Sequence, residues 1–485
     1  MKKMLLFLIS FVFLPSAFSQ DWTEPVQIST LQGLNNNPDF CIDNSGTLHC
    51  VWGYKIATNY HVIYYSRSFD DGLNWSTPLN VSQNTSLWMG NPHIVADSQN
   101  SLHLTYDYNT GSTGGGTLIV YKKYNGNYWS SNHDTISVGW PGARHNRLVI
   151  DHNDKLYCFW FHEYQNGTTF YRIFENCTWG EIMIPPFDNS NRYFLAKAIV
   201  DSMNGIHFSG YHYYNGQSSY DQEIVYSTYE NQIWSELTEV SKDYQVWAGN
   251  DIALDGELYP HIVWRQTVSN TIPANDGTLY SKLDENSWSY PEIIVEDPSD
   301  QAIAIDKNNK VHIVDNEKFE DGYRLVHYQL VNNEWVGELI DEDNYGNYGN
   351  ILISRNHYLY LTSAKAYGNY PNTNISIVLR KFEILTNIES NLKPSFNSFN
   401  IYPNPSTENT TIAYSLEETK HTEIKIYNLA GKLLITLLDK KQAPGNYQIK
   451  WNGTDKNGKE VNSGLYLIRL QAGRQIMTRS VEVIK

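Results

Sequence analysis

The sequence predicts an all-β protein, and three observations support that prediction. Aromatic residues make up 14% of the 485 residues, with 36 Tyr and 14 Trp, and such side chains favour the half-buried surfaces of strands. Short apolar segments alternate with polar turns, whereas runs of helix-forming residues are scarce. Tryptophans recur at intervals of roughly fifty residues, which is the signature of a repeat architecture. They are Trp22, Trp75, Trp129, Trp179, Trp234, Trp288 and Trp335.

The N-terminal segment 1–19, MKKMLLFLISFVFLPSAFS, has the features of an export signal. Two lysines precede an apolar run that is too short to span a bilayer comfortably, and the segment ends in small residues. It predicts a secretory signal peptide. The mature protein is therefore expected to be exported, and to be soluble or attached to the cell surface.

Charge and cysteine content exclude some classes of partner. The formal net charge is −16, from 36 basic and 52 acidic residues, which argues against binding to a phosphate backbone, so no nucleic-acid partner is predicted. Four cysteines are present, and none forms a C-x-x-C pair of the kind that zinc ribbons use. The pairs Cys41/Cys50 and Cys158/Cys177 are compatible with two local disulfides or with free thiols.

A second motif runs in step with the tryptophans. It consists of an apolar strand ending near Asp, a polar turn and a strand that opens with His or Tyr. Seven copies are present: IDNSGTLHCVW (42–52), ADSQNSLHLTY (96–106), IDHNDKLYCFW (150–160), VDSMNGIHFSG (200–210), LDGELYPHIVW (254–264), IDKNNKVHIVD (305–315) and the divergent ISRNHYLYLTS (353–363). Each copy continues through a Tyr-rich third strand and a turn that ends in Trp. Four short antiparallel strands per unit predict a seven-bladed β-propeller over residues 20–386.

The two ends of the repeat region complement each other. The seventh copy stops after its third strand, SIVLRKFEIL (376–385), whereas DWTEPVQIS (21–29) begins with the W-[ST]-x-P signature of the fourth strands. We therefore expect the N-terminal strand to close the propeller by completing the seventh blade, which removes a free sheet edge.

The turn SFDDGLNWSTP, residues 68–78, resembles the Asp-box of the neuraminidase repeat, S-x-D-x-G-x-[ST]-W, with Asn74 where that family usually has Ser or Thr. The resemblance implies a structural role in which Asp and Gly form the turn and Trp packs between blades. It implies no particular activity, because hydrolases, lyases and binding proteins share such repeats.

A separate module follows the polar linker 387–400. Segment 401–485 alternates strands with Pro and Gly turns, which predicts a small β-sandwich. Its motifs YPNP (402–405), IY (426–427), the turn from Trp451 to Gly458, and SGLY (463–466) resemble the type A C-terminal sorting domain of the type IX secretion system of Bacteroidetes. The resemblance implies the secretion machinery as a partner, passage across the outer membrane, and release or attachment at the surface.

A binding or active site is expected at one mouth of the central channel, where loops and strand ends of all blades meet. The residue four before each turn Asp varies between copies, as does the residue that ends each second strand. From these positions and their neighbours the candidate catalytic residues are His145, Arg147, His162, His212 and Tyr213, and the candidate substrate-binding residues are His93, Lys197, Asp251, Arg265 and Glu163. By contrast, His49, His103, His207, His261 and His312 recur at one position in five of the seven copies and are expected to anchor turns.

Two functions from different classes fit this pattern. The first is degradation of an extracellular polysaccharide, with β-elimination favoured, because the His, Tyr and Arg candidates suit removal of a proton beside a uronate carboxylate. Hydrolysis would instead use two carboxylates, for which Asp39, Asp251, Glu163 and Glu317 are available. The second function is non-catalytic binding of glycan or protein by a surface lectin or adhesin. The protein is expected to be a monomer without a cofactor, and the binding of a structural metal ion is left open.

Overall fold

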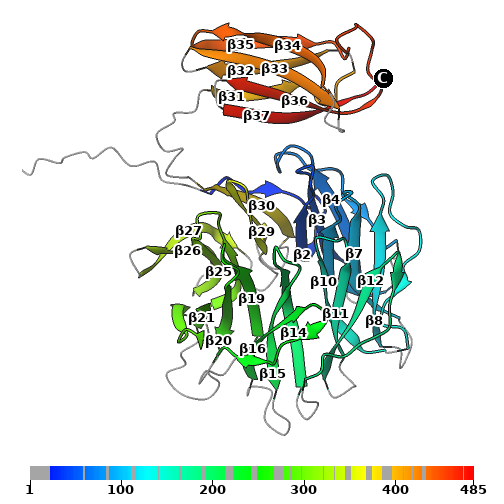
Figure 1. Cartoon of the computed structure of the whole chain (residues 1–485), viewed down its shortest axis with the longest axis vertical. Coiled ribbons are helices and arrows are strands. Elements are labelled where there is room, and N and C mark those ends of the chain that lie inside the picture. The colour runs from blue at the N-terminus through cyan, green and yellow to red at the C-terminus, as the bar shows by residue number, and fades with distance from the viewer. Residues whose placement is uncertain are drawn as a thin grey trace, which may run out of the picture.

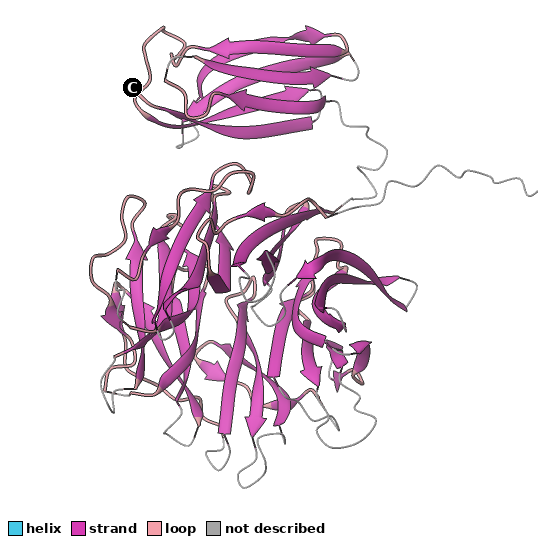
Figure 2. Ribbon diagram, turned by 180° about the vertical axis from the view of Figure 1, so that it is seen from behind, coloured by secondary structure: helices cyan, strands magenta, loops and turns pink. Residues whose placement is uncertain are grey.

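The structure is entirely β, which confirms the predicted fold class (Figure 2). The computed structural model describes residues 22–485 apart from 58–59, 84–86, 111–115, 140, 163–166, 188–191, 214–221, 242–247, 267–276, 285–286, 297, 320–321, 332–333, 345–350, 368–373, 385–395, 408, 417–418, 429–432 and 473–474. No helix in this described part is long and apolar enough to cross a membrane.

Each copy of the repeat forms a set of antiparallel strands, and Figure 1 shows these sets side by side. We number them sheet 1 to sheet 7. Sheet 1 comprises β2 (Leu34–Ile42), β3 (Leu48–Ala57), β4 (Tyr60–Ser68) and β5 (Leu79–Asn80). Sheet 2 comprises β6 (Met89–Ala96), β7 (Leu102–Asn109), β8 (Thr117–Tyr124) and β9 (Asp134–Thr135). Sheet 3 comprises β10 (Ala143–Ile150), β11 (Leu156–His162), β12 (Thr168–Glu175) and β13 (Thr178–Trp179).

The remaining copies follow the same order. Sheet 4 comprises β14 (Arg192–Val200), β15 (Ile206–Tyr213), β16 (Gln222–Glu230), β17 (Ile233–Trp234) and β18 (Thr238–Glu239). Sheet 5 comprises β19 (Ala248–Leu254), β20 (Pro260–Gln266), β21 (Gly277–Asp284), β22 (Ser287–Trp288) and β23 (Glu292–Glu296). Sheet 6 comprises β24 (Pro298–Ile305), β25 (Val311–Phe319), β26 (Gly322–Val331) and β27 (Glu334–Asn344). Sheet 7 comprises β28 (Ile351–Arg355), β29 (Tyr358–Tyr367), β30 (Asn374–Glu383) and β1 (Val26–Gln27). Such sheets are consistent with propeller blades.

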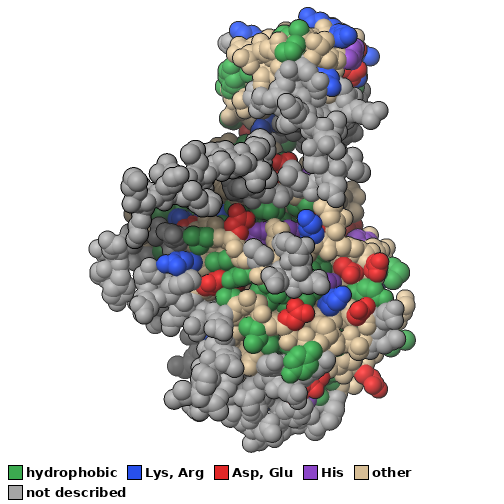
Figure 3. Space-filling view, turned by 90° about the vertical axis from the view of Figure 1, so that its left-hand side faces the viewer, with side chains coloured by type: hydrophobic (Ala, Val, Ile, Leu, Met, Phe, Trp, Pro, Cys, Tyr) green, Lys and Arg blue, Asp and Glu red, His purple; other side chains and the backbone are tan. Residues whose placement is uncertain are grey.

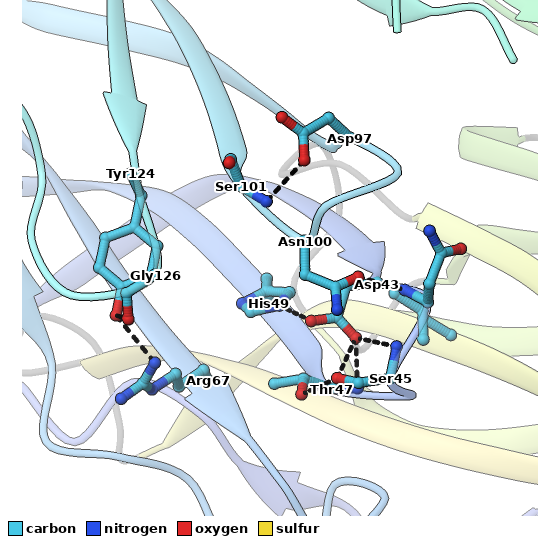
Figure 4. Close-up of polar contacts among 12 residues, drawn as sticks. Asp43, Ser45, Thr47, His49, Arg67, Asp97, Asn100, Ser101, Tyr124 and Gly126 are labelled. Carbon is cyan, nitrogen blue, oxygen red and sulfur yellow. Dashed lines mark hydrogen bonds and ion pairs between the residues drawn. The ribbon is translucent and has the colours of Figure 1, made fainter. Parts of the chain in front are cut away.

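The Asp and His residues that recur in the repeats form a network of hydrogen bonds that anchors the turns. In sheet 1, Asp43 Oδ1 accepts hydrogen bonds from the backbone N–H groups of Ser45 and Thr47, both at 2.9 Å, while Oδ2 lies 3.2 Å from His49 Nε2 (Figure 4). His49 Nδ1 lies 2.9 Å from the Tyr65 hydroxyl on the third strand. One buried chain of Asp, His and Tyr therefore ties three strands of the sheet together.

The same network recurs in other sheets, which confirms that these histidines anchor turns. The His Nε2 to Asp Oδ2 distance is 3.2 Å for His103, 3.1 Å for His207, 3.6 Å for His261 and 3.3 Å for His312. Two sheets contain a variant of this Asp–His–Tyr network. In sheet 3 the Tyr157 hydroxyl donates to Asp151 at 3.3 Å, and in sheet 6 His327 replaces the tyrosine, 2.9 Å from His312.

Apolar cores lie between successive sheets rather than within one. Val51 and Ile63 of sheet 1 pack with Ile94 and Leu104 of sheet 2, and corresponding clusters join each later pair. Trp52 of sheet 1 packs with Ile377 of sheet 7 in a further cluster. Each sheet consequently depends on its neighbours for burial of its apolar surface.

The N-terminal strand joins the last repeat. β1 pairs antiparallel with β30, and Val26 lies opposite Leu379. Ile28 is fully buried, and its N–H donates to the carbonyl of Ile377 at 2.8 Å. Trp22, further toward the N-terminus, donates from Nε1 to Nδ1 of His327 in sheet 6 at 3.2 Å.

The C-terminal residues form two facing sheets with a core of their own. One contains β31 (Phe396–Tyr402), β32 (Thr410–Leu416) and β35 (Gly445–Trp451), and the other β34 (Leu433–Gln442), β33 (Lys420–Asn428), β36 (Gly464–Ala472) and β37 (Gln475–Val483). Phe399, Ile426, Trp451 and Ile468 are buried between them. This agrees with the predicted small sandwich.

All four cysteines are free thiols. Cys50 and Cys158 are fully buried, which raises the pKa of both thiols above the ordinary value. Of the two alternatives left by the sequence, the structure contains free thiols rather than local disulfides.

Replacing Ile28 with Ala should destabilise the protein through loss of buried surface at the joined ends of the chain. The substitution leaves a cavity, and such changes usually cost about 2–5 kcal/mol in the free energy of unfolding. Urea unfolding followed by tryptophan fluorescence measures this loss. The control is Ile233→Ala, because Ile233 is 70% exposed and should change stability by less than about 0.5 kcal/mol. Equal, small effects of the two substitutions would contradict the contribution of the N-terminal strand.

The histidine pair of sheet 6 should make stability sensitive to acid. Burial, together with the neighbouring His312, lowers the pKa of His327 to about 3, whereas an unfolded histidine titrates near 6.5. Between these values the unfolded state binds the additional proton, so stability should decrease as the pH falls below about 6.5.

Replacing His327 with Gln should remove this contribution. The slope of unfolding free energy against pH between 4.5 and 6 should decrease by up to about 1.4 kcal/mol per pH unit. Urea titrations across that range provide the measurement. The control His421→Gln alters a side chain that is 59% exposed and should leave the slope unchanged. An unaltered slope in His327→Gln would show that His327 does not take up the proton on unfolding.

Candidate functional site

A cavity of about 280 Å³ lies where the first strands of the seven sheets approach one another. Its lining includes one or more residues from each of β2, β6, β10, β14, β19, β24 and β28, together with Tyr211 of β15. No other described cavity collects residues from so many repeats. The residues from successive first strands are Asn37, His93, Arg147, Lys197, Asn250, Gln301 and Ile351.

A β-bulge in the first strands directs side chains at this cavity. The register between first and second strands shifts between Asn36 and Asp39, and again between Gly90 and His93 and between Arg144 and Arg147. Such bulges bend a strand and change the direction of the side chain that follows. His145, within one of them, has φ of 53°, an unusual backbone conformation for a non-glycine residue.

The residues after the bulges form contacts from sheet to sheet. His93 Nδ1 lies 3.3 Å from Asp39 Oδ2, and Arg147 Nη1 lies 3.0 Å from the His93 ring nitrogens. Lys197 Nζ lies 3.3 Å from Asp251 Oδ1. Polar contacts therefore join Asp39, His93 and Arg147 of sheets 1 to 3, and an ion pair joins Lys197 of sheet 4 to Asp251 of sheet 5.

Three of these side chains also hold the backbone of the next sheet. Asp39 Oδ2 accepts from the N–H of Ile94 at 2.7 Å, and Asp251 Oδ2 accepts from the N–H of Ile303 at 3.1 Å. Arg147 Nε donates to the carbonyl of Ala196 at 2.6 Å. The Arg147 side chain thus contacts sheets 2 and 4 and does not point freely into solvent. Arg147 therefore has a structural role, because it links sheet 3 to sheets 2 and 4.

Burial and neighbouring charges set the protonation of this cluster. Burial and the Arg147 charge lower the pKa of His93 to about 4, so His93 is neutral near pH 7. Burial lowers the pKa of Arg147, but Asp39 and Asp251 oppose that shift. Burial acts to raise the pKa of Asp39, yet His93 and the N–H of Ile94 outweigh it and keep this pKa below the ordinary value.

His145 lies at the exposed rim of the cavity. Its ring centroid is 5.5 Å from that of Phe194, and its backbone N–H donates to Asp107 Oδ2 at 3.1 Å. Asp107 is fully buried and also accepts from Asn91 Nδ2 at 2.7 Å and Asn146 Nδ2 at 2.8 Å. Burial raises the pKa of Asp107 above its ordinary value. Asp107 thus fixes the bulge that presents His145.

The candidates from the second strands lie apart from the cavity lining or at its edge. His162 is buried beside Phe170 of its own sheet. His212 stacks on Tyr193, with 4.9 Å between ring centroids, and its Nδ1 lies 3.5 Å from Glu223. Arg265 is half-buried on β20, opposite Ala248 in register. Tyr213 ends β15 opposite Arg192, and Glu163 lies outside the described residues.

Tyr211, which the sequence analysis did not select, lines the cavity instead of its neighbours. Tyr211 is 5% exposed and lies on β15, and its hydroxyl interacts electrostatically with Arg147. Because side chains alternate along a strand, Tyr211 and His212 face opposite sides of the sheet. Asp107 occupies the equivalent position in sheet 2. Arg265 occupies this position in sheet 5, whereas His162 and His212 occupy the adjacent position in sheets 3 and 4.

The cavity lining does not resemble a metal centre. None of the described residues that line it belongs to a group of three potential metal ligands. Figure 3 shows basic side chains scattered among acidic ones on the face that it draws, rather than gathered into one basic surface.

The C-terminal segment matches the family model of the secretion system C-terminal sorting domain over residues 400–484. Chains that carry this type IX sorting domain are secreted across the outer membrane, which confirms the predicted localisation. The secretion machinery is thereby identified as one partner of the chain. No curated protein matches the sequence.

Solved structures resemble the chain in fold. An ulvan lyase of polysaccharide lyase family 25, solved with a bound GlcA(1-4)Rha3S saccharide, is 11% identical, with a TM-score of 0.54; the alignment covers 73% of this chain and 95% of the lyase. An α-L-arabinanase from Penicillium chrysogenum in complex with arabinobiose is 12% identical and has a TM-score of 0.42, over 74% of this chain and 98% of that chain. The first similarity shows a shared fold; the second is too low to support an argument.

Deleting residues 400–485 should block export at the outer membrane while leaving the rest of the chain folded, because the C-terminal sheets have their own core. Fractionation of the native host should then find the truncated protein in the periplasm. As the control, a reporter with a signal peptide should reach the medium or cell surface when residues 387–485 are fused to its C-terminus. Normal surface delivery of the truncated chain would contradict the role of the sorting domain.

Proposed function

We propose that the seven sheets form one closed seven-bladed propeller over residues 20–386, followed by a linker (387–400) and the sorting domain (401–485). Contacts between first strands support this arrangement: β2 contacts β6, and the series continues through β10, β14, β19, β24 and β28 back to β2. The pairing of β1 with β30 supplies the fourth strand of the last blade. The cavity lined by all seven first strands is then the mouth of the central channel.

We infer that this mouth degrades an acidic extracellular polysaccharide by β-elimination. The observation that carries the inference is the presence of Tyr211, Arg147 and Lys197 in one cavity, with His145 at its rim. An ionised tyrosine or a neutral histidine can accept the proton beside a uronate carboxylate, and nearby cations stabilise the charge that develops on that carboxylate. The sugar–oxygen bond at the neighbouring carbon then breaks, a carbon–carbon double bond forms, and the leaving oxygen takes up a proton.

Tyr211 is the best-placed base in this proposal. Tyr211 lines the same cavity as Arg147, and a nearby positive charge favours the ionised form in which a tyrosine can act as a base. His145 is exposed at the rim, where it can contact the incoming sugar or return the proton to the leaving oxygen. The resemblance in fold to an ulvan lyase, described with a uronate-containing saccharide, is consistent with this choice of substrate class.

Hydrolysis is less well supported, because the three of its candidate carboxylates that the structure describes have partners elsewhere. Asp39 and Asp251 accept hydrogen bonds from neighbouring first strands, and Glu317 accepts one from the Tyr328 hydroxyl. Among the described residues that line the cavity, Asp300 is the one carboxylate, whereas most glycosidases use two.

The second candidate function is glycan or protein binding without catalysis, and one observation favours it. Arg147, Asp39 and Asp251 hold neighbouring sheets together, so their charges have structural partners in the absence of any ligand. A cavity whose charges are already satisfied can bind a ligand without performing chemistry.

Replacing Tyr211 with Phe tests the catalytic proposal, since the change removes one hydroxyl and preserves the ring. The chain should be incubated with sulfated, uronate-containing and neutral polysaccharides while unsaturated-uronate absorbance is recorded. We expect the parent to release unsaturated uronate from an acidic polysaccharide, and Tyr211→Phe to lower that rate by about a hundredfold or more. The melting temperature should stay within a few degrees of the parent value.

Tyr226→Phe is the matched control in the same sheet. Its hydroxyl lies 2.6 Å from His207 in the turn-anchoring network, so its loss should lower stability and leave turnover at the remaining folded sites unchanged. His145→Ala should reduce turnover without a change in stability, because the side chain is exposed. If the parent binds acidic glycans but releases no product, the non-catalytic function replaces the enzymatic one.

A further inference from the structure

Sheet 4 departs from the other repeats at one position in the turn after its first strand. The residue two before the repeat histidine carries a side chain in the other sheets, but it is Gly205 in sheet 4; the other residues are Thr47, Ser101, Tyr259 and Lys310, with Lys155 before Tyr157 in sheet 3. Glu230, at the end of the third strand, approaches this turn and adds a third ligand-type side chain to the repeated pair of Asp and His. Sheets 3 and 5 also have an acidic residue at the end of the third strand, but sheet 3 has no histidine in its turn and sheet 5 has Tyr259 in place of the glycine.

Asp201, His207 and Glu230 each offer one ligand atom, and these three atoms lie within 4.8 Å of one another. Asp201 and His207 are 4% and 5% exposed, and Asp201 Oδ2 lies 3.1 Å from His207 Nε2. Asp201 Oδ1 accepts from the N–H groups of Met203 at 2.7 Å and Gly205 at 2.8 Å. The turn thus fixes the orientation of the carboxylate and leaves Oδ2 facing the histidine.

Gly205 keeps the space between the two carboxylates open. A Cβ at this position would lie 2.6 Å from Asp201 Oδ2 and 3.0 Å from Glu230 Cγ. The backbone of Gly205 has no positive φ, so the conformation itself does not require glycine. The requirement is one of space. A cavity of about 800 Å³ between sheets 3 and 4, lined by Asp201, Gly205 and Glu230, leads from solvent to this point.

We propose that this turn of sheet 4 binds one divalent first-row transition-metal ion of the zinc class. Zinc accepts both imidazole nitrogen and carboxylate oxygen as ligands, so His207, Asp201 and Glu230 would supply three ligands and water from the cavity the fourth. Ligand atoms about 2.0–2.1 Å from a tetrahedral ion lie roughly 3.3 Å apart, close to the 3.1 Å between Asp201 Oδ2 and His207 Nε2. Calcium, which prefers oxygen ligands, suits the histidine less well.

The surroundings of His207 fit a metal ligand. Its Nδ1 lies 2.6 Å from the Tyr226 hydroxyl. When Nε2 binds the ion, the ring carries its proton on Nδ1 and donates it to the Tyr226 oxygen; such an outer contact fixes the ring and increases its basicity. The other histidine-containing turns retain the Asp–His pair but have a Cβ at the Gly205 position. The site is therefore a specialisation of one repeat, away from the channel mouth.

The test uses untagged mature chain, treated with chelator and titrated with zinc chloride by calorimetry. All proteins carry His421→Ala, because His421, Glu423 and Asp439 form a second, exposed group of potential ligands. We expect one zinc ion per chain, with affinity at least tenfold weaker in Glu230→Gln. Gly205→Ser, which gives the turn the residue that sheet 2 carries as Ser101, should weaken binding similarly while the chain stays folded.

Glu175→Gln is the matched control. Glu175 occupies the equivalent position in sheet 3, where Tyr157 replaces the histidine, so zinc binding should be unchanged. Calcium chloride at the same concentrations should give no comparable binding. The proposal is overturned if the parent binds no zinc, if Glu230→Gln binds as tightly as the parent, or if Glu175→Gln weakens binding to the same extent as Glu230→Gln.

Discussion

The fold depends on contacts between neighbouring sheets, because no single sheet has enough apolar surface on one side to form its own core. The apolar clusters all join side chains from two sheets, and polar contacts follow the same plan. At the turns, Asn44 N–H donates to Asn100 Oδ1 of the next sheet, and His152 N–H does the same with Asn204 Oδ1. At the opposite ends of the first strands, Asp39, Arg147 and Asp251 each bind the backbone of the next sheet.

These contacts restrict the chemistry that the channel mouth can perform. A charge that holds a neighbouring strand is stabilised in one orientation before any ligand arrives, which suits it to stabilise charge that develops during a reaction. The same charge is poorly suited to accept or release a proton. Proton transfer therefore falls to side chains that do not hold the backbone of a neighbouring sheet in the contacts described above, and Tyr211 and His145 are the candidates of that kind. Equivalent strand positions therefore serve different roles in different sheets. Some hold the backbone of a neighbouring sheet, and others present a side chain to the cavity.

Much of the fold could be predicted from the sequence, because the period of the repeat, the turn Asp and the His column each reflect local chemistry that every repeat needs. The candidate site was predicted less completely. His93, Arg147 and Lys197 do line one cavity, since they share one position in successive first strands, and His145 lines it from two residues before Arg147. His162 and His212 lie on the other side of their strands from Tyr211, and a choice between adjacent columns cannot be made without knowing which side faces the channel. The bulges add a second difficulty, because they shift the alternation of side chains at that point.

The pairing of β1 with β30 also has a consequence for the order of folding. Gln27 and Ser376, whose side chains are 3.0 Å apart, are separated by 349 residues, whereas strands within a repeat are joined by short turns. Bringing such distant segments together costs roughly 3 kcal/mol more chain entropy than closing a loop of about ten residues, since each doubling of loop length adds about 0.6 kcal/mol. Local hairpins can therefore form early, while the first strand of the mature chain waits for the last repeat. An exported chain that has crossed the inner membrane would remain incomplete until its two distant ends meet, and during that interval the unpaired edge of β30 is available to chaperones or to a second unfolded chain.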